Sequence, residues 1–144
     1  MVAIVHNSGS LSNALPYNEN KVKQGVAECI HSMSYPKDTG WLSFKDKSNR
    51  LEKLTMLNQQ TTINSFHISL NFDPSEKLSS EKLKEIAEVY MQKIGFGEQP
   101  YLVCQHYDTG HPHLHIVTAS IRENGKLIKL HNLGQHRSMN AYSC

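Results

Sequence analysis

The 144-residue sequence contains no apolar run near the roughly 18 residues that a membrane-spanning helix needs. Its start has no basic flank followed by a long apolar stretch, so we expect neither membrane insertion nor secretion. The three cysteines cannot all pair and form no CxxC motif, which favours a reducing, cytoplasmic setting. The net charge of +2 is too small for a protein that binds its partners through bulk charge alone.

Histidine is the residue type whose placement is uneven. The length and the 38% hydrophobic content are ordinary for one domain with a single core. Six of the nine histidines nevertheless lie at or beyond His106, and four fall within the ten residues from His106 to His115. This stretch is the first place to look for a metal or catalytic site.

The N-terminal part of the chain alternates strand and helix signals. Val2–Val5 is short and β-branched, which predicts a first strand. Asn18 is a suitable N-cap for a helix whose apolar residues recur at helical spacing as far as Met33. Trp41–Phe44 is predicted as a short strand, and Ser48 as the N-cap of a second helix.

The remaining signals are clearer. Residues 63–72 alternate with period two, which predicts a strand with one apolar face and one polar face. A helix is predicted from Ser79 or Ser80 to a C-capping Gly95. Residues 101–107 and 112–121 form a predicted hairpin, followed by a turn at 123–125 that leads into 126–130.

These elements predict an α+β fold in which helices pack on one face of a largely antiparallel sheet. We assign the domain to residues 1–132. Residues 133–144 are polar and aperiodic, and we expect them to lead into a portion that this chain lacks.

The predicted hairpin can bring three histidines together. His113 and His115 are two residues apart on a strand, so both side chains project from the same face. If the turn lies at 108–111, His106 pairs with His113 and shares that face. A slip of one residue in the register would move His106 to the opposite face. Three imidazoles on a rigid ribbon leave coordination positions open, as a catalytic metal requires. His111 lies in the turn and is less suited to this role.

Tyr17 directly precedes the predicted helix start. A helix N-terminus favours a phosphate or a developing phenolate, and Lys21 and Lys23 add positive charge nearby. Only a small fraction of a phenol is ionised at neutral pH, so a tyrosine nucleophile must be activated by a metal or a base. From local sequence alone, a tyrosine that packs at the start of a helix is the commoner case. Tyr35 is a second candidate.

Three segments taken together resemble the relaxase (mobilisation nuclease) family. Its members are HUH endonucleases of conjugative and mobilisable elements. The segments are Ala14–Val22, Phe66–Leu70 and Gln105–Val117, and they occur in family order over roughly residues 1–132. His113–His115 matches the family's His-hydrophobic-His element. His106 matches its third metal ligand, and Tyr17 its N-terminal catalytic tyrosine.

The resemblance implies an HUH-type fold and a nuclease that nicks single-stranded DNA at an origin of transfer, for plasmid or transposon mobilisation. Tyr17 would attack the scissile phosphodiester, leaving a 5′-phosphotyrosine link and a free 3′-hydroxyl. A divalent cation on His106, His113 and His115 would stabilise charge in the transition state. Mg²⁺ or Mn²⁺ is the expected ion, although three neutral nitrogens also suit Zn²⁺, Ni²⁺ or Co²⁺.

The resemblance also implies supporting residues and partners. Asp108, His67 and Asp73 are candidates for orienting a ligand or activating the phenol, although Asp108 also suits a tight turn and His67 a structural role. Accessory mobilisation proteins are expected partners. The expected DNA contacts are basic residues: Lys21, Lys23, Arg122, Lys126 and Lys129.

Two alternatives remain open at the level of sequence. His111–Val117 also resembles the His-x-His-x-His strand of histidine-triad nucleotide hydrolases, which use a histidine nucleophile without metal. That interpretation gives His111 a role but leaves none for His106 or Tyr17. A metal-stapled module that binds DNA without cleaving it is the other alternative.

Overall fold

The computed structural model describes residues 1–6, 11–108, 110–111, 113–128 and 138–139. Among the helices in these ranges, none combines the length and the apolar character needed to cross a membrane. The elements, in chain order, are β1 (Val2–His6), α1 (Leu11–Lys23), β2 (Ala27–Met33), the 3₁₀ turn η1 (Thr39–Trp41), α2 (Phe44–Thr55), β3 (Ser65–Asn71), α3 (Ser80–Lys93), β4 (Tyr101–His106), β5 (His113–Ala119) and β6 (Ser138–Met139).

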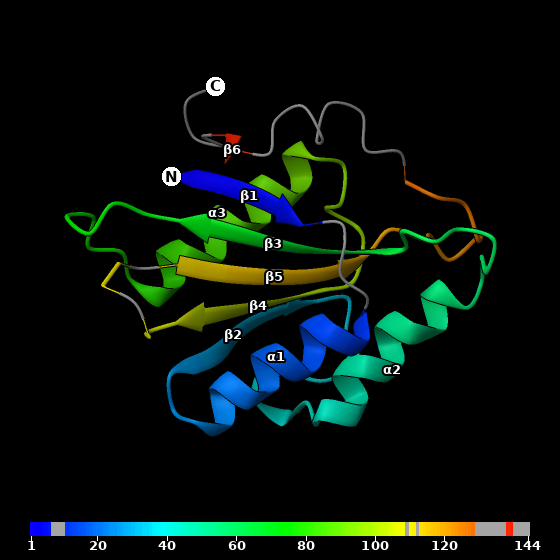
Figure 1. The fold of residues 1–144 in the computed structure, drawn as a ribbon, viewed down its shortest axis with the longest axis horizontal. Coiled ribbons are helices and arrows are strands. Elements are labelled where there is room, and N and C mark those ends of the chain that lie inside the picture. The colour runs from blue at the N-terminus through cyan, green and yellow to red at the C-terminus, as the bar shows by residue number, and fades with distance from the viewer. Residues whose placement is uncertain (7–10, 109, 112, 129–137, 140–144) are drawn as a thin grey trace.

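The strands form one antiparallel sheet in the order β2-β4-β5-β3-β1-β6, as Figure 1 shows. This confirms the predicted α+β class with its antiparallel sheet. The hairpin register is also confirmed, because His106 pairs with His113 across β4 and β5. Residues on β3 continue the same face, with Ser69 opposite His115 and Asn71 opposite His113.

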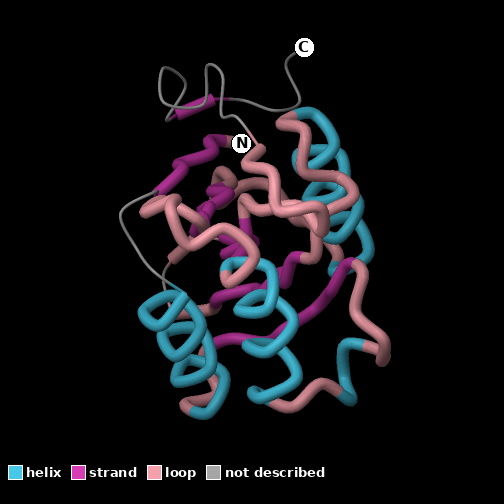
Figure 2. The backbone as a smooth tube through the Cα atoms, turned by 90° about the vertical axis from the view of Figure 1, so that its right-hand side faces the viewer, coloured by secondary structure: helices cyan, strands magenta, loops and turns pink. Residues whose placement is uncertain are grey.

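The helices lie on both faces of the sheet, which corrects the expectation of one face (Figures 1 and 2). On one face, α3 packs Ile86 and Tyr90 against Phe66 and Ile68 of β3. On the other face, α1 and α2 pack against alternate residues of β4 and β5. That second cluster contains Leu11, Ala14, Leu15, Leu42, Leu51, Leu54, Leu102, Val117 and Ala119. The histidine face of β5 is therefore the face that α1 covers.

Helix α1 differs most from the prediction. The expected helix from Asn18 to Met33 is wrong, because the helix begins at Leu11 and residues 27–33 form the edge strand β2. Gly25 ends α1 with φ +77°, and the N–H groups of Gly25 and Val26 bond to the carbonyls of Val22 and Lys21. This is the Schellman arrangement in which a glycine accepts a left-handed conformation.

The start of α2 also differs. The strand predicted at Trp41–Phe44 is wrong, since Trp41 ends a 3₁₀ turn and Phe44 begins α2. The N-cap is Ser43 rather than Ser48, and Ser43 forms a capping box with Asp46. β3, α3, β4 and β5 lie close to their predicted positions, whereas β6, which pairs with β1, was not predicted. The domain boundary expected at residue 132 falls outside the described residues.

Candidate functional site

Three histidines meet at the turn end of the β4–β5 hairpin. His106 ends β4, His113 begins β5, and His115 is the third residue of β5. One potential ligand atom from each side chain lies within 4.8 Å of the others. All three side chains are buried, with residue exposures of 1%, 7% and 8% for His106, His113 and His115. The backbone ladder holds them, so the cluster is preformed.

Burial lowers the pKa of two of these imidazoles, so that His106 and His115 are neutral at physiological pH. It lowers the pKa of His106 to about 4, with a further lowering from His113. It lowers the pKa of His115 to about 2, with further lowering from His106 and His67. A neutral imidazole offers one lone pair, which is the form that coordinates a metal.

His67 on β3 orients His115. The Nε2 of His67 hydrogen-bonds to the Nδ1 of His115. If His115 donates from Nδ1, its Nε2 carries the free lone pair, in the manner of an imidazole held by an outer partner. Burial, reinforced by His6, lowers the pKa of His67 to about 4. The structure thus brings His67 to the cluster, as the sequence analysis allowed.

His106 has a partner that the sequence analysis missed. Its Nε2 lies 2.8 Å from Oδ1 of Asn18, a buried residue of α1. Its Nδ1 is also buried and has no hydrogen-bond partner among the described residues. A buried nitrogen without a partner is costly unless a cation accepts its lone pair. The three histidines therefore fit a divalent metal ion.

Tyr17 faces the histidines from α1. Its ring centre lies 6.0 Å from that of His106, in a stacked arrangement, and 5.9 Å from that of His115. Tyr17 is the seventh of the 13 residues of α1, so the prediction that it precedes the helix is wrong and no helix N-terminus supports it. The residue is 44% exposed, so the ring remains accessible from solvent.

A cavity of about 430 Å³ opens beside this tyrosine. Tyr17, His67 and His115 line it, together with His6 from β1. His6 was another residue that the sequence analysis missed, and its ring centre lies 5.8 Å from that of His67. The cavity places open space next to both the phenol and the histidine cluster, where a substrate can enter.

A family model for the relaxase MobA/VirD2-like nuclease domain matches residues 17–143. The chain belongs to this family. Comparison with curated proteins finds no significant match. The family confirms the resemblance noted from sequence and assigns a DNA-nicking nuclease domain of the relaxase type.

The relaxase domain holds Asp108 close to the cluster but already engaged. Its Oδ2 accepts a hydrogen bond from the Nζ of Lys21 at 2.7 Å, and its Oδ1 lies 3.9 Å from Nε2 of His113. The hydrogen bond from Lys21 lowers the pKa of the Asp108 carboxyl. A carboxylate with a lowered pKa is a weaker base. Asp108 is therefore better suited to positioning Lys21 than to removing the proton of the Tyr17 phenol.

Other residues singled out from sequence are engaged elsewhere or lie at the edge of the histidine cluster. The Oδ1 of Asp73 accepts hydrogen bonds from the N–H and hydroxyl of Ser75, at 2.9 and 2.6 Å, and so closes the turn after β3. The hydroxyl of Tyr35 donates to the Lys47 carbonyl at 2.8 Å, and burial raises its pKa. His111 lies in the turn before β5, with its ring centre 5.6 Å from that of His113.

The basic residues divide between the two ends of the sheet. Lys21 and Lys23 lie in the last turn of α1, and Lys21 pairs with Asp108, which lies 3.9 Å from His113. Arg122 and Lys126 follow the far end of β5, about 20 Å from His113 at roughly 3.3 Å per residue along the strand. Lys129 lies outside the described residues. A DNA strand that reached both groups would have to run the length of the sheet.

Proposed function

We propose that this relaxase domain nicks single-stranded DNA at an origin of transfer, with Tyr17 as nucleophile and a divalent cation held by His106, His113 and His115. One observation carries the proposal. The Tyr17 ring lies 6.0 and 5.9 Å from the rings of His106 and His115, centre to centre. A phosphate in the adjoining cavity is therefore within reach of both the phenol and the metal-binding nitrogens.

The reaction is a transesterification at phosphorus. The Oη of Tyr17 forms a bond to the phosphorus while the bond to the 3′-oxygen breaks, and the phenolic proton is lost as the 3′-oxygen gains one. When bound, the cation supplies charge stabilisation at a non-bridging oxygen of the phosphate. The 5′-phosphotyrosine link conserves the phosphodiester energy, so a 3′-hydroxyl can reverse the step and reseal the strand.

The neighbouring residues have supporting roles in this proposal. His67 orients His115, Asp108 holds Lys21 beside the phenol, and Asp73 stabilises its turn. Lys21, Lys23, Arg122, Lys126 and Lys129 contact the DNA backbone. Mg²⁺ or Mn²⁺ is the working ion, although imidazole ligands also accept Zn²⁺, Ni²⁺ or Co²⁺. The reaction takes place on plasmid or transposon DNA in the cytoplasm, with accessory mobilisation proteins.

The test is a covalent-adduct assay. Labelled single-stranded oligonucleotides that tile the DNA flanking the gene are incubated with the protein and Mn²⁺, then separated on a denaturing gel. We expect a protein–DNA band that is lost with EDTA and with Tyr17→Phe. Tyr35→Phe is the matched control and should retain the protein–DNA band, because the Tyr35 hydroxyl donates its hydrogen bond to the Lys47 carbonyl. A band that survives Tyr17→Phe, or its absence in the wild type, overturns the mechanism.

The same assay separates the alternatives. The histidine-triad alternative needs His111 in the active strand, whereas His111 precedes β5. His111→Ala should therefore retain the DNA adduct. The triad mechanism would be favoured instead if the protein hydrolysed a nucleoside phosphoramidate without metal and His111→Ala abolished that hydrolysis. Binding of a hairpin oligonucleotide without any adduct would favour a DNA-binding module that does not cleave.

A further inference from the structure

We infer that Asn18 is a positioning residue that fixes the tautomer of His106, so that this histidine binds the metal through Nδ1. The inference rests on the proposed metal site and adds a residue outside the His-x-His element. Asn18 is 5% exposed and lies in the middle of α1, next to Tyr17 in sequence. A buried amide in a helix needs partners for both its oxygen and its nitrogen.

The orientation of the Asn18 amide follows from its other hydrogen bond. The Nδ2 group donates to the carbonyl of Ala14 at 3.0 Å, one turn earlier in α1. The opposite orientation would place the amide oxygen against that carbonyl oxygen, which repels it. Oδ1 is therefore the atom that meets Nε2 of His106, at 2.8 Å.

The tautomer of His106 follows from that orientation. An amide oxygen can only accept, so Nε2 of His106 must carry the hydrogen. In a neutral imidazole, the lone pair then lies on Nδ1. This is the nitrogen that is buried without a hydrogen-bond partner among the described residues.

His115 shows the complementary arrangement. Its Nδ1 is hydrogen-bonded to Nε2 of His67, and with Nδ1 as the donor its Nε2 carries the lone pair. The ring centres of His106 and His115 are only 3.9 Å apart. In that arrangement the two adjacent histidines present different nitrogens, with Asn18 behind the ring of His106 and His67 behind the ring of His115.

The position of Asn18 links the metal site to the nucleophile. The ring of Tyr17 stacks on His106, while the side chain of the next residue holds Nε2 of the same histidine. One turn of α1 therefore places the phenol and orients a ligand. A shift of α1 along the sheet would disturb both functions together.

The test compares Asn18→Leu, which has a similar size but no acceptor, with Asn18→Asp, which retains an oxygen acceptor. Asn20→Leu is the matched control, because Asn20 is exposed on the same helix. The first readout is the His106 tautomer in the metal-free protein at neutral pH, from long-range ¹H–¹⁵N spectra. The second is the Zn²⁺ dissociation constant from calorimetry, with Zn²⁺ as a diamagnetic probe.

We expect the Nε2–H tautomer in the wild type and a mixture of tautomers in Asn18→Leu. Zn²⁺ affinity should fall about ten- to a hundredfold in Asn18→Leu, the usual cost of losing a partner behind a metal ligand. Asn18→Asp should restore most of it, and Asn20→Leu should leave it unchanged. A wild-type His106 protonated at Nδ1 overturns the inference, even if Asn18→Leu fails to fold. An unchanged Zn²⁺ affinity in a folded Asn18→Leu variant also overturns the inference.

The two readouts also separate this inference from the proposed function. If the wild type has the Nε2–H tautomer but binds no Zn²⁺, the metal site fails while the Asn18 contact stands. If Zn²⁺ binds and Tyr17 forms the DNA adduct while His106 is protonated at Nδ1, the proposed function stands and the role of Asn18 is wrong.

Discussion

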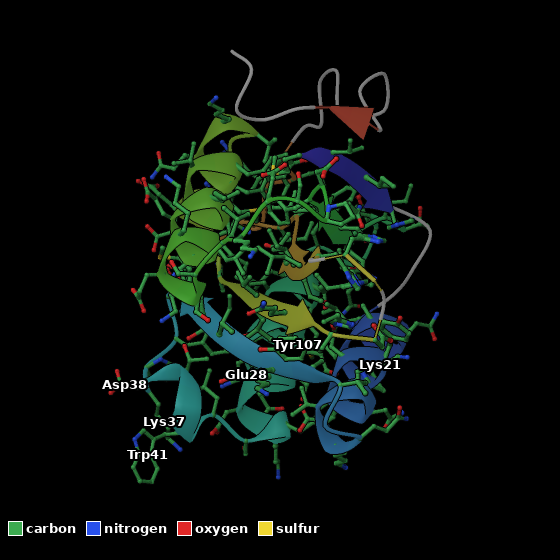
Figure 3. The ribbon with its side chains drawn as sticks, turned by 90° about the vertical axis from the view of Figure 1, so that its left-hand side faces the viewer. Lys21, Glu28, Lys37, Asp38, Trp41 and Tyr107 are labelled. Atoms are coloured by element: carbon green, nitrogen blue, oxygen red, sulfur yellow. The ribbon has the colours of Figure 1, made fainter. Side chains whose placement is uncertain are left out.

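The Nζ of Lys21 lies 2.7 Å from Oδ2 of Asp108, and this ion pair joins α1 to the turn between β4 and β5. The same Nζ lies 5.7 Å from the centre of the Tyr17 ring. Figure 3 labels Lys21 on α1, beside that turn. Asp108 thus holds a cation next to the proposed nucleophile, where it can stabilise negative charge on the phenol oxygen or on the substrate phosphate.

Replacing Lys21 with Met should slow formation of the DNA adduct more than replacing Lys23. Lys21 is held by Asp108 beside Tyr17, whereas Lys23 is an exposed residue of the same helix turn. We expect a loss of about tenfold in rate for Lys21→Met, the effect of roughly 1.4 kcal/mol on the transition state. Lys23→Met should stay within about twofold, as a solvated phosphate contact does. Equal effects in single-turnover assays would contradict a specific role for Lys21.

Metal binding should stabilise the fold, and His113→Ala should remove that effect. A ligand that binds only the folded state adds about 2.7 kcal/mol when present at a hundred times its dissociation constant. Thermal unfolding with and without Zn²⁺, and after EDTA, measures this shift. The control is His31→Ala, a half-buried histidine on β2 that does not belong to the cluster. A metal-dependent shift that persists in His113→Ala would place the ion elsewhere.

Ser43→Ala should lower the free energy of unfolding by about 1 kcal/mol, the typical cost of losing an N-cap. The hydroxyl of Ser43 accepts a hydrogen bond from the N–H of Asp46 at 3.0 Å. Ser48→Ala is the comparison, because Ser48 lies inside α2 and its hydroxyl only donates to the Lys45 carbonyl at 3.3 Å. Urea unfolding of both variants measures the difference. A larger loss for Ser48→Ala would place the cap where the sequence predicted it.

The contribution of Asp46 to stability should depend on pH. The hydrogen bond from the Ser43 backbone N–H, followed by that from Lys37, lowers the pKa of the Asp46 carboxyl below its ordinary 3.8. A lowered folded-state pKa stabilises the fold above pH 3.8, and this contribution is lost as the pH falls through the folded-state value. Asp46→Ala should therefore be less stable than wild type at pH 6. The gap should narrow below pH 3.8, and a gap that stays constant down to pH 2.5 would contradict this linkage.

Local pattern was sufficient for much of the sheet and for α3. The alternation of residues 63–72 predicted β3, because a strand between an apolar layer and a polar layer shows period two. Gly95 predicted the end of α3. Its φ of +87° confirms that a glycine is placed there to adopt the left-handed conformation that ends the helix. The spacing around Asp108 predicted the pairing of His106 with His113, because the turn length fixes the register of a hairpin.

Local pattern failed where packing decides. Val22 and Val26 continue a helical spacing, yet Gly25 ends α1 and β2 gains its hydrogen bonds from β4. Helical propensity is worth only tenths of a kcal/mol per residue, so these ladder bonds and the burial of β2 outweigh it. The face on which each helix packs likewise depends on which side of the sheet has room for its apolar stripe.

The contacts between α1 and the histidine hairpin belong to this second group. The histidines of one hairpin are neighbours in sequence, so their shared face follows from strand geometry alone. Asn18 and His106 are 88 residues apart, and their hydrogen bond exists only because α1 packs across the face of the hairpin. Nothing in the local sequence distinguishes a helix cap from a buried asparagine. Tertiary packing therefore decides which nitrogen of His106 is left free and which tyrosine faces it.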